Sequence, residues 1–97
     1  MFARIASYQF KPGTAAEVAR KAAEGLAPLY RTHAGFHSYQ VILTGTDTGY
    51  SVSTWESEAQ ARAAVNDAAA WVKANVAEQI VATENHVGSV AFSQSAS

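Results

Sequence analysis

Two stretches of the chain carry side chains that can bind a flat compound or handle a proton. The first stretch, "FHSYQVILT", has His37 and Tyr39 at alternating positions, and the second, "SVSTW", has Ser51, Ser53 and Trp55 at alternating positions. Alternate side chains of a β-strand point to the same face, so each set is expected to share one side of its strand. If both sets lie on one side of a sheet, Tyr39 and Trp55 can sandwich an aromatic ligand while the small serines leave room for it.

Each candidate has a functional and a structural interpretation. Imidazole titrates near neutral pH, so His37 is a candidate general base, and Tyr39 can donate a hydrogen bond to a bound carbonyl. Trp55 and Trp71 are candidate ligand contacts. The structural alternatives are an ordinary hydrogen-bond partner for His37, cross-strand packing of Tyr39, packing of Trp55 on the helix that follows it, and core or interface filling by Trp71.

The sequence predicts four strands and two helices to hold these residues. Alternating apolar residues bounded by turn residues indicate strands at 2–10, 36–44, 50–56 and 85–92. Each helix is expected to begin with a capping box, "TAAE" from Thr14 and "SEAQ" from Ser57, in which the hydroxyl and the fourth side chain bond to each other's backbone amide. The first helix should end before Gly35.

Apolar residues at helical spacing predict which face of each helix is buried. In the first helix these residues are Val18, Ala22, Leu26, Leu29 and Tyr30. In the second helix they are Val65, Ala69, Val72, Val76 and Ile80, with Trp71 on the flank.

The predicted order of elements is that of a ferredoxin-like βαββαβ fold of the α+β class, with a four-stranded antiparallel sheet and both helices on one face. We expect one domain at residues 1–93 and a disordered polar tail at 94–97. Apart from Arg4 and Glu56, the predicted strands carry no charge. The second face of the sheet should therefore be covered by another copy, giving a homodimer with the sheets packed face to face.

Composition disfavours several other classes of protein. Charged residues make up 15% of the 97 residues, against about 25% in an average soluble domain, and the net charge of −1 disfavours nucleic acid as a partner. There is no cysteine, and the three histidines lack metal-ligand spacing, so we expect neither a disulfide nor a metal site. No apolar run suits a membrane span or a signal peptide, which predicts a cytoplasmic protein that does not bind membranes.

The chain resembles a known family in its order of elements and in three motifs: "KPG" before the first helix, "LYRTHAGF" leading into the second strand, and "STWESEAQARAA" across the third strand and second helix. These features are similar to the antibiotic biosynthesis monooxygenase (ABM) superfamily of dimeric α+β barrels, over residues 2–92. The resemblance implies dimerisation through the sheets and a cavity between sheet and helices in each subunit.

The resemblance leaves the activity open. It implies a small aromatic or quinone-like ligand and a possible cofactor-independent monooxygenase, an enzyme that binds a flat phenol or quinol, stabilises its anion and keeps water away while oxygen reacts. A non-catalytic ligand-binding or stress-response protein of the same fold is the alternative. A dimer whose cavity is filled by side chains is a third.

The haem-degrading branch of the superfamily implies an asparagine on the first strand and a tryptophan and an iron-ligating histidine on the second helix. Counting from Trp55 and Gly13, these positions correspond to Ala6, Ala64 and Ala74. None of the three matches, so haem degradation is disfavoured and no cofactor is expected.

Overall fold

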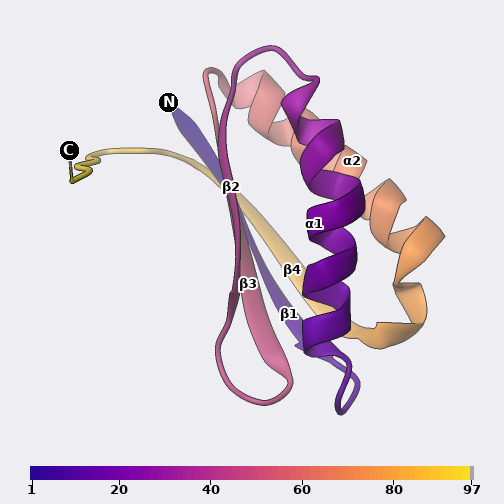
Figure 1. Cartoon of the computed structure of the whole chain (residues 1–97). Coiled ribbons are helices and arrows are strands. Elements are labelled where there is room, and N and C mark those ends of the chain that lie inside the picture. The colour runs from indigo at the N-terminus through magenta and orange to yellow at the C-terminus, as the bar shows by residue number, and fades with distance from the viewer. Residues whose placement is uncertain (97) are drawn as a thin grey trace.

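The computed structural model describes residues 1–96 and has the predicted ferredoxin-like architecture. Its elements are β1 (Phe2–Phe10), α1 (Ala15–Arg31), β2 (Phe36–Leu43), β3 (Thr48–Trp55), α2 (Glu58–Asn75), a 3-10 turn η1 (Ala77–Gln79) and β4 (Ile80–Ser89). The strands form one antiparallel sheet in the order β2-β3-β1-β4. Both helices cover the same face of this sheet (Figure 1).

The segment after β4 leaves the body of the protein on the side away from the helices (Figure 1). Residues 90–96 form neither helix nor strand. The predicted disordered tail at 94–97 extends to Ser97, which lies outside the described residues. Within residues 1–96, no helix is both long and apolar enough to cross a membrane.

The pairing of the strands decides which side chains face the helices. Tyr39 pairs with Ser53, and Ser51 pairs with Ala6, so these residues share one side of the sheet. Along β3 the members of this set are buried and alternate with more exposed residues. Tyr39 therefore lies on the same face as Ser51, Ser53 and Trp55, and that face is the one the helices cover.

His37 is an exception to the predicted alternation. The register between β2 and β3 shifts between Phe36 and Ser38, which inserts one extra residue into β2 at this point. A β-bulge of this kind interrupts the two-residue period of a strand. The expectation that His37 and Tyr39 follow one simple alternation is therefore wrong.

The two helices bury their faces differently. In α1 the buried residues include Val18, Ala22, Leu26 and Tyr30, as predicted, whereas Leu29 is 40% exposed. In α2 the buried residues are Ala61, Ala64 and Ala68. Of the predicted stripe, Val76 is buried just after the end of the helix, and Val72 and Ile80 are partly buried against it. Alanine has no side chain beyond Cβ, so this face lets the helix lie close to the sheet, and the larger residues fall at its flanks.

The last strand begins earlier than the sequence predicts. Helical spacing places Ile80 at the end of the second helix, but α2 ends at Asn75 and Ile80 pairs with Phe10 as the first residue of β4. β4 also ends at Ser89 instead of Phe92. A short apolar run such as "IVAT" fits either element, and pairing with β1 decides between them here.

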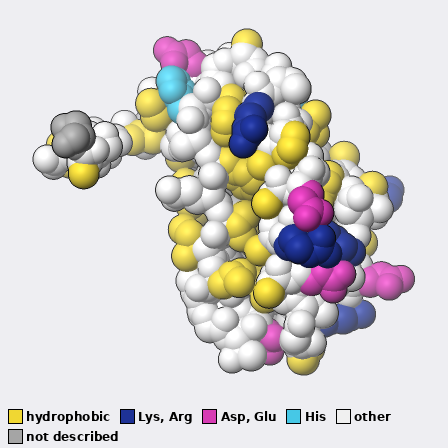
Figure 2. All heavy atoms as spheres, in the orientation of Figure 1, with side chains coloured by type: hydrophobic (Ala, Val, Ile, Leu, Met, Phe, Trp, Pro, Cys, Tyr) yellow, Lys and Arg dark blue, Asp and Glu magenta, His cyan; other side chains and the backbone are white. Residues whose placement is uncertain are grey.

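Charged side chains concentrate over the helices in the view of Figure 2, while hydrophobic side chains gather along the seam between the helices and the sheet. The charges on the helices include the ion pairs Arg20–Glu24 and Lys21–Glu17 on α1 and Arg62–Glu58 on α2, each one helical turn apart. These pairs keep the solvent side of the helices polar.

Only one of the two predicted capping boxes is present. Ser57 accepts a hydrogen bond from the amide of Gln60, and the Gln60 side chain accepts one from the amide of Ser57. Thr14 makes no such side-chain cap, and its hydroxyl donates instead to the carbonyl of Lys11. The predicted partner Glu17 pairs with Lys21.

This difference makes the two helix starts unequal in stability. Replacing Ser57 by alanine should lower the free energy of unfolding by about 1 kcal/mol, the usual value for a lost N-cap. The matched variant Thr14→Ala should cost less than about half of this, because no orphan amide of α1 loses a partner. Urea denaturation of both variants measures the two values, and equal losses would contradict the assignment of the caps.

Candidate functional site

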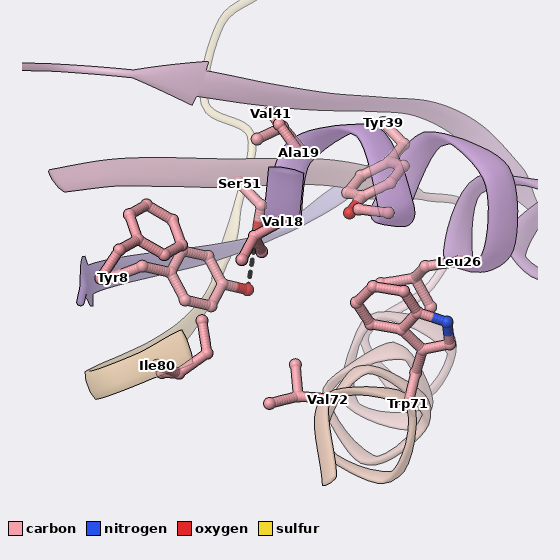
Figure 3. A pocket seen from close by; sticks show the side chains of 12 residues that line it. Tyr8, Val18, Ala19, Leu26, Tyr39, Val41, Ser51, Trp71, Val72 and Ile80 are labelled. Atoms are coloured by element: carbon pink, nitrogen blue, oxygen red, sulfur yellow. Dashed lines mark hydrogen bonds between the residues drawn. The ribbon is translucent and has the colours of Figure 1, made fainter. Parts of the chain in front are cut away.

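A small cavity lies between the sheet and the helices (Figure 3). Its volume is about 20 Å³, enough for roughly one water molecule. Its lining is mainly apolar, and Figure 3 shows Tyr39 and Trp71 at one end and Tyr8 and Ile80 at the other. In this state the cavity, called the central cavity below, is almost filled by side chains.

A larger cleft opens beside it, between α2 and β4. This cleft, called the α2–β4 cleft below, has a volume of about 380 Å³, which falls within the range of about 300–1,000 Å³ typical of small-molecule sites. Tyr8, Val72 and Ile80 line both the cleft and the central cavity. These three side chains are therefore the partition between the two spaces.

Arg4 lies at the inner end of the cleft and is only 2% exposed. Its Nε donates to Asn85 Oδ1 at 2.9 Å and its Nη2 donates to the Tyr8 hydroxyl at 3.1 Å. Its Nη1 lies 3.4 Å from the Tyr30 hydroxyl and 3.3 Å from Ser51 Oγ. The guanidinium thus sits among neutral oxygen atoms, two of them at the long end of hydrogen bonding.

The hydroxyl groups around Arg4 form a connected network. Tyr8 and Ser51 share a hydrogen bond of 3.0 Å, drawn as a dashed line in Figure 3. The Tyr30 hydroxyl donates to the carbonyl of Ala64 on α2 at 3.1 Å. The network therefore connects the sheet to both helices.

Two tyrosines of the site are held in their neutral form. Burial raises the pKa of Tyr30 from 10.0 to about 12, even though the positive charge of Arg4 acts in the opposite direction. Burial also raises the pKa of Tyr39 well above the usual tyrosine value. At neutral pH both hydroxyls can donate hydrogen bonds but cannot serve as bases.

Three of the predicted site residues line the central cavity, namely Tyr39, Ser51 and Trp71. The hydroxyl of Tyr39 bonds to none of the side chains drawn around the cavity in Figure 3. Trp71 is positioned by a close approach of the helices: a Cβ at Gly25 would lie 2.6 Å from its Nε1. The absence of a side chain at Gly25 is therefore what gives the indole its place.

Trp55 and Ser53 lie apart from this cavity. Trp55 is 1% exposed, donates a hydrogen bond from its indole to Ser53 Oγ at 2.9 Å, and packs edge-on against Tyr30 with ring centroids 5.1 Å apart. A separate hollow of about 160 Å³, which also includes His33 and Asp67, reaches its edge. Trp55 also belongs to the buried cluster that contains Ala61, Ala64 and Ala68 of α2, the helix that follows it.

His37 also lies outside the cavity and the cleft. Its Nε2 is 2.7 Å from Glu56 Oε2, and the side chain is 39% exposed. The geometry therefore gives it no contact with a ligand in either space, and the expected role as general base has no support from its position.

Sequence reasoning misses Arg4, Tyr8 and Asn85 as site residues. In the sequence, Arg4 stands out only as an exception in an otherwise uncharged strand. Its position could have been suspected from β1 itself, because it alternates with Phe2 and Ala6 on the side that is buried. A lone arginine between apolar residues on one strand face is the available signal.

The model of the antibiotic biosynthesis monooxygenase family matches residues 1–74, three quarters of the chain. The chain belongs to the antibiotic biosynthesis monooxygenase family. No curated protein matches it. The family includes monooxygenases, and membership is consistent with the fold described above.

Solved structures of the same fold cover almost the whole chain. An NE2512 protein of unknown function from Nitrosomonas europaea has a TM-score of 0.81 at 22% identity, covering 99% of this chain and 94% of that one. A monooxygenase from the gene ActVA-Orf6 of Streptomyces coelicolor, in complex with nanaomycin D, has a TM-score of 0.77 at 16% identity, covering 99% and 92%. At these identities the likeness concerns the fold.

A third similar structure binds a porphyrin. A mutant of MhuD, with two manganese protoporphyrin IX bound per active site, has a TM-score of 0.76 at 18% identity and covers 99% of this chain and 100% of that one. In the present ABM-family chain, α2 contains no histidine, and the positions implied for the haem-binding residues are Ala6, Ala64 and Ala74. The three histidines line neither the central cavity nor the α2–β4 cleft. The side chains around these two spaces do not fit histidine-ligated haem.

The raised pKa of Tyr30 predicts how stability depends on alkaline pH. In the unfolded chain a tyrosine ionises near pH 10, whereas Tyr30 in the folded protein keeps its proton to about pH 12. The unfolded state therefore loses protons first, and the free energy of unfolding should fall as pH rises from 10 to 12.

The variant Tyr30→Phe removes this titration, and the two states differ by about 0.8 of a proton near pH 11, so between pH 10.5 and 11.5 its slope should be shallower by about 1.1 kcal/mol per pH unit. Urea denaturation across this range measures the slope. The same measurement at pH 8 records the loss of the hydrogen bonds alone. Identical slopes for the variant and the wild type would contradict the pKa of Tyr30.

Proposed function

We propose that this protein binds a small aromatic or quinone-like compound in the α2–β4 cleft, with its ring reaching toward Tyr39 and Trp71 in the central cavity. The observation that carries the proposal is the ligand-sized cleft separated from an aromatic-lined cavity by only three side chains. Family membership supports the same location, because ABM proteins use the space between sheet and helices.

Entry of the ring requires the partition to move. The central cavity of about 20 Å³ is too small for a ring, so Tyr8, Val72 and Ile80 must shift when a ligand enters. β4 is an edge strand that pairs only with β1, and Ile80 lies next to the irregularity in that pairing. The chain at this point is held by fewer hydrogen bonds than the centre of the sheet, which favours such a shift.

The chemistry that fits the family is cofactor-independent monooxygenation. A phenolic substrate with an activated CH₂ group loses a proton, its carbanion transfers electrons to O₂ as a C–O bond forms, and the hydroperoxide loses water. The balance is CH₂ + O₂ → C=O + H₂O, so the substrate supplies the electrons. Tyr39 would donate a hydrogen bond to the anionic oxygen, and the apolar lining would exclude water.

A second candidate, a ligand-binding protein without turnover, is favoured by a specific observation. Among the described residues that line the central cavity and the α2–β4 cleft there is no histidine, aspartate or glutamate. Proton removal would then depend on the acidity of the compound itself. Only compounds that ionise readily could be oxidised, and others would bind without reaction.

Oxygen uptake distinguishes the two functions. With an anthrone as substrate, the enzyme should consume one O₂ per carbonyl formed, and Tyr39→Phe should lower the rate by about tenfold to a hundredfold through loss of a hydrogen-bond donor. The matched control Tyr50→Phe removes a hydroxyl from a half-exposed ring outside the cavity and should retain the rate. His37→Ala should also stay within about twofold of the wild type, because the imidazole contacts neither space.

The alternative outcomes of this assay are also informative. A ligand-binding protein would raise its melting temperature with the anthrone or a quinone and consume no oxygen. A protein that shows neither uptake nor a shift in melting temperature would contradict both functions.

The proposal extends to a homodimer formed through the uncovered face of the sheet. Ile5, Ile42 and Tyr50 lie on the side of the sheet away from the helices and are 41%, 43% and 45% exposed. Large apolar residues clustered on a sheet face are costly to leave in water. A second copy placed sheet to sheet would cover all three, and ABM proteins are commonly dimeric.

Sedimentation velocity tests the dimer. The wild type at micromolar concentration should have twice the mass of one chain, and Ile5→Glu should shift it to the monomer because a carboxylate would be buried without a partner. Ala23→Glu on the exposed side of α1 is the control and should remain dimeric. A wild type that sediments as a monomer would overturn this part of the proposal.

A further inference from the structure

Arg4 is a buried cation without a buried anion to match it. No carboxylate of the described residues lies within 4 Å of its guanidinium, and its hydrogen bonds all go to neutral oxygen atoms. Asp67 of α2 lies 2.8 Å from His33 instead. Glu84 is next to Asn85 on β4 and therefore points to the other face of the sheet, where it lies 2.9 Å from His86. A charge removed from water without a counter-charge destabilises the folded state.

The orientation of the guanidinium shows where an anion would fit. In arginine the N–H groups of Nε and Nη2 are parallel, and this edge matches the two oxygens of a carboxylate. In Arg4 these two nitrogens bond to Asn85 and Tyr8, both of which line the α2–β4 cleft. Nη1 points instead toward Ser51 and Tyr30 in the interior.

The residue that now occupies this edge can be displaced. Asn85 is exposed and lies on the edge strand β4, so its side chain can turn toward water. Its carbonyl oxygen is a neutral substitute for an anionic one, 2.9 Å from Nε. Once displaced, its amide nitrogen would still be close enough to donate to the incoming group.

The charges around the cleft also favour an anionic ligand. Lys73 is the second cation in its lining, and none of the lining residues is acidic. Positive charges in a cleft raise the local concentration of anions. The polar end of the cleft therefore complements a negative group, and its walls of alanine, valine and isoleucine complement an apolar body.

We propose that the Nε/Nη2 edge of Arg4 binds the carboxylate of an aromatic acid that occupies the α2–β4 cleft. This assignment rests on the proposed ligand site and specifies the chemical class of its ligand. The carboxylate replaces the Asn85 oxygen on Nε, and its second oxygen takes the bond from Nη2 that Tyr8 now accepts. The ring extends past Tyr8 toward the central cavity.

A purely structural role for Arg4 makes a different prediction about its removal. In Arg4→Met the Tyr30 bond to Ala64 and the Tyr8–Ser51 bond both remain, and a buried charge is replaced by an apolar chain of similar length. Such replacements are often neutral or stabilising. We expect the melting temperature of the variant to lie within about 4 °C of the wild type or above it.

The experiment compares a charged and a neutral ligand of the same shape. Binding of 2-naphthoate and 2-naphthamide is measured by calorimetry with the wild type, Arg4→Met and, as the matched control, Arg62→Met on the exposed side of α2. The wild type should bind naphthoate at least about tenfold more tightly than naphthamide, and Arg4→Met should remove this preference without weakening naphthamide. Arg62→Met, which removes an exposed charge outside the cleft and the central cavity, should leave the naphthoate affinity within about twofold of the wild type.

The result separates this inference from the proposed function. Equal affinities for the two ligands in the wild type, or an unchanged naphthoate affinity in Arg4→Met, would overturn the role of Arg4 while aromatic binding stands. A neutral quinone that binds when naphthoate does not would also overturn the role of Arg4 and leave the proposed aromatic binding in place. A drop in melting temperature of more than about 8 °C in Arg4→Met, with the naphthoate preference retained, would make Arg4 structural. If none of these compounds binds, both proposals fail.

Discussion

A single guanidinium organises the space between the sheet and the helices. Arg4 belongs to β1 and forms hydrogen bonds to side chains of β3, β4 and α1, and Tyr30 extends the network to α2. A buried charge of this kind must keep every available hydrogen bond, because each lost one increases the cost of its burial. The hydroxyl groups of Tyr8, Tyr30 and Ser51 therefore stay close to the guanidinium.

The alanines of α2 determine how closely this helix approaches the residues around Arg4. Ala61, Ala64 and Ala68 bring the helix close enough for the Ala64 carbonyl to accept a bond from Tyr30. One turn further on, Trp71 and Val72 follow the alanines, and both line the central cavity. The alanines thus form the close contact of α2 with the core, and the larger residues that follow them form part of the wall of the cavity.

Much of this arrangement follows from local pattern, and the rest does not. The alternation of Ser51, Ser53 and Trp55 predicts one buried face, and "SEAQ" predicts the start of α2, because both depend on residues adjacent in sequence. The bulge at His37 depends on how β2 pairs with β3, so no pattern within β2 reveals it. Burial of Arg4 depends on acceptors from three other elements, separated from it by 26 to 81 positions. Long-range contacts of this kind are what the sequence leaves undetermined.

The contact between Gly25 and Trp71 lowers the stability of α1 and keeps the indole in the wall of the central cavity. Glycine inside a helix is less favourable than alanine by about 0.8–1.0 kcal/mol, so stability alone would favour a methyl group at this position. That methyl would lie 2.6 Å from the indole Nε1, so the indole of Trp71, which lines the central cavity, would have to move. The absence of a methyl group at Gly25 of α1 therefore allows Trp71 of α2 to keep its place in the wall of the central cavity, at some cost in helix stability.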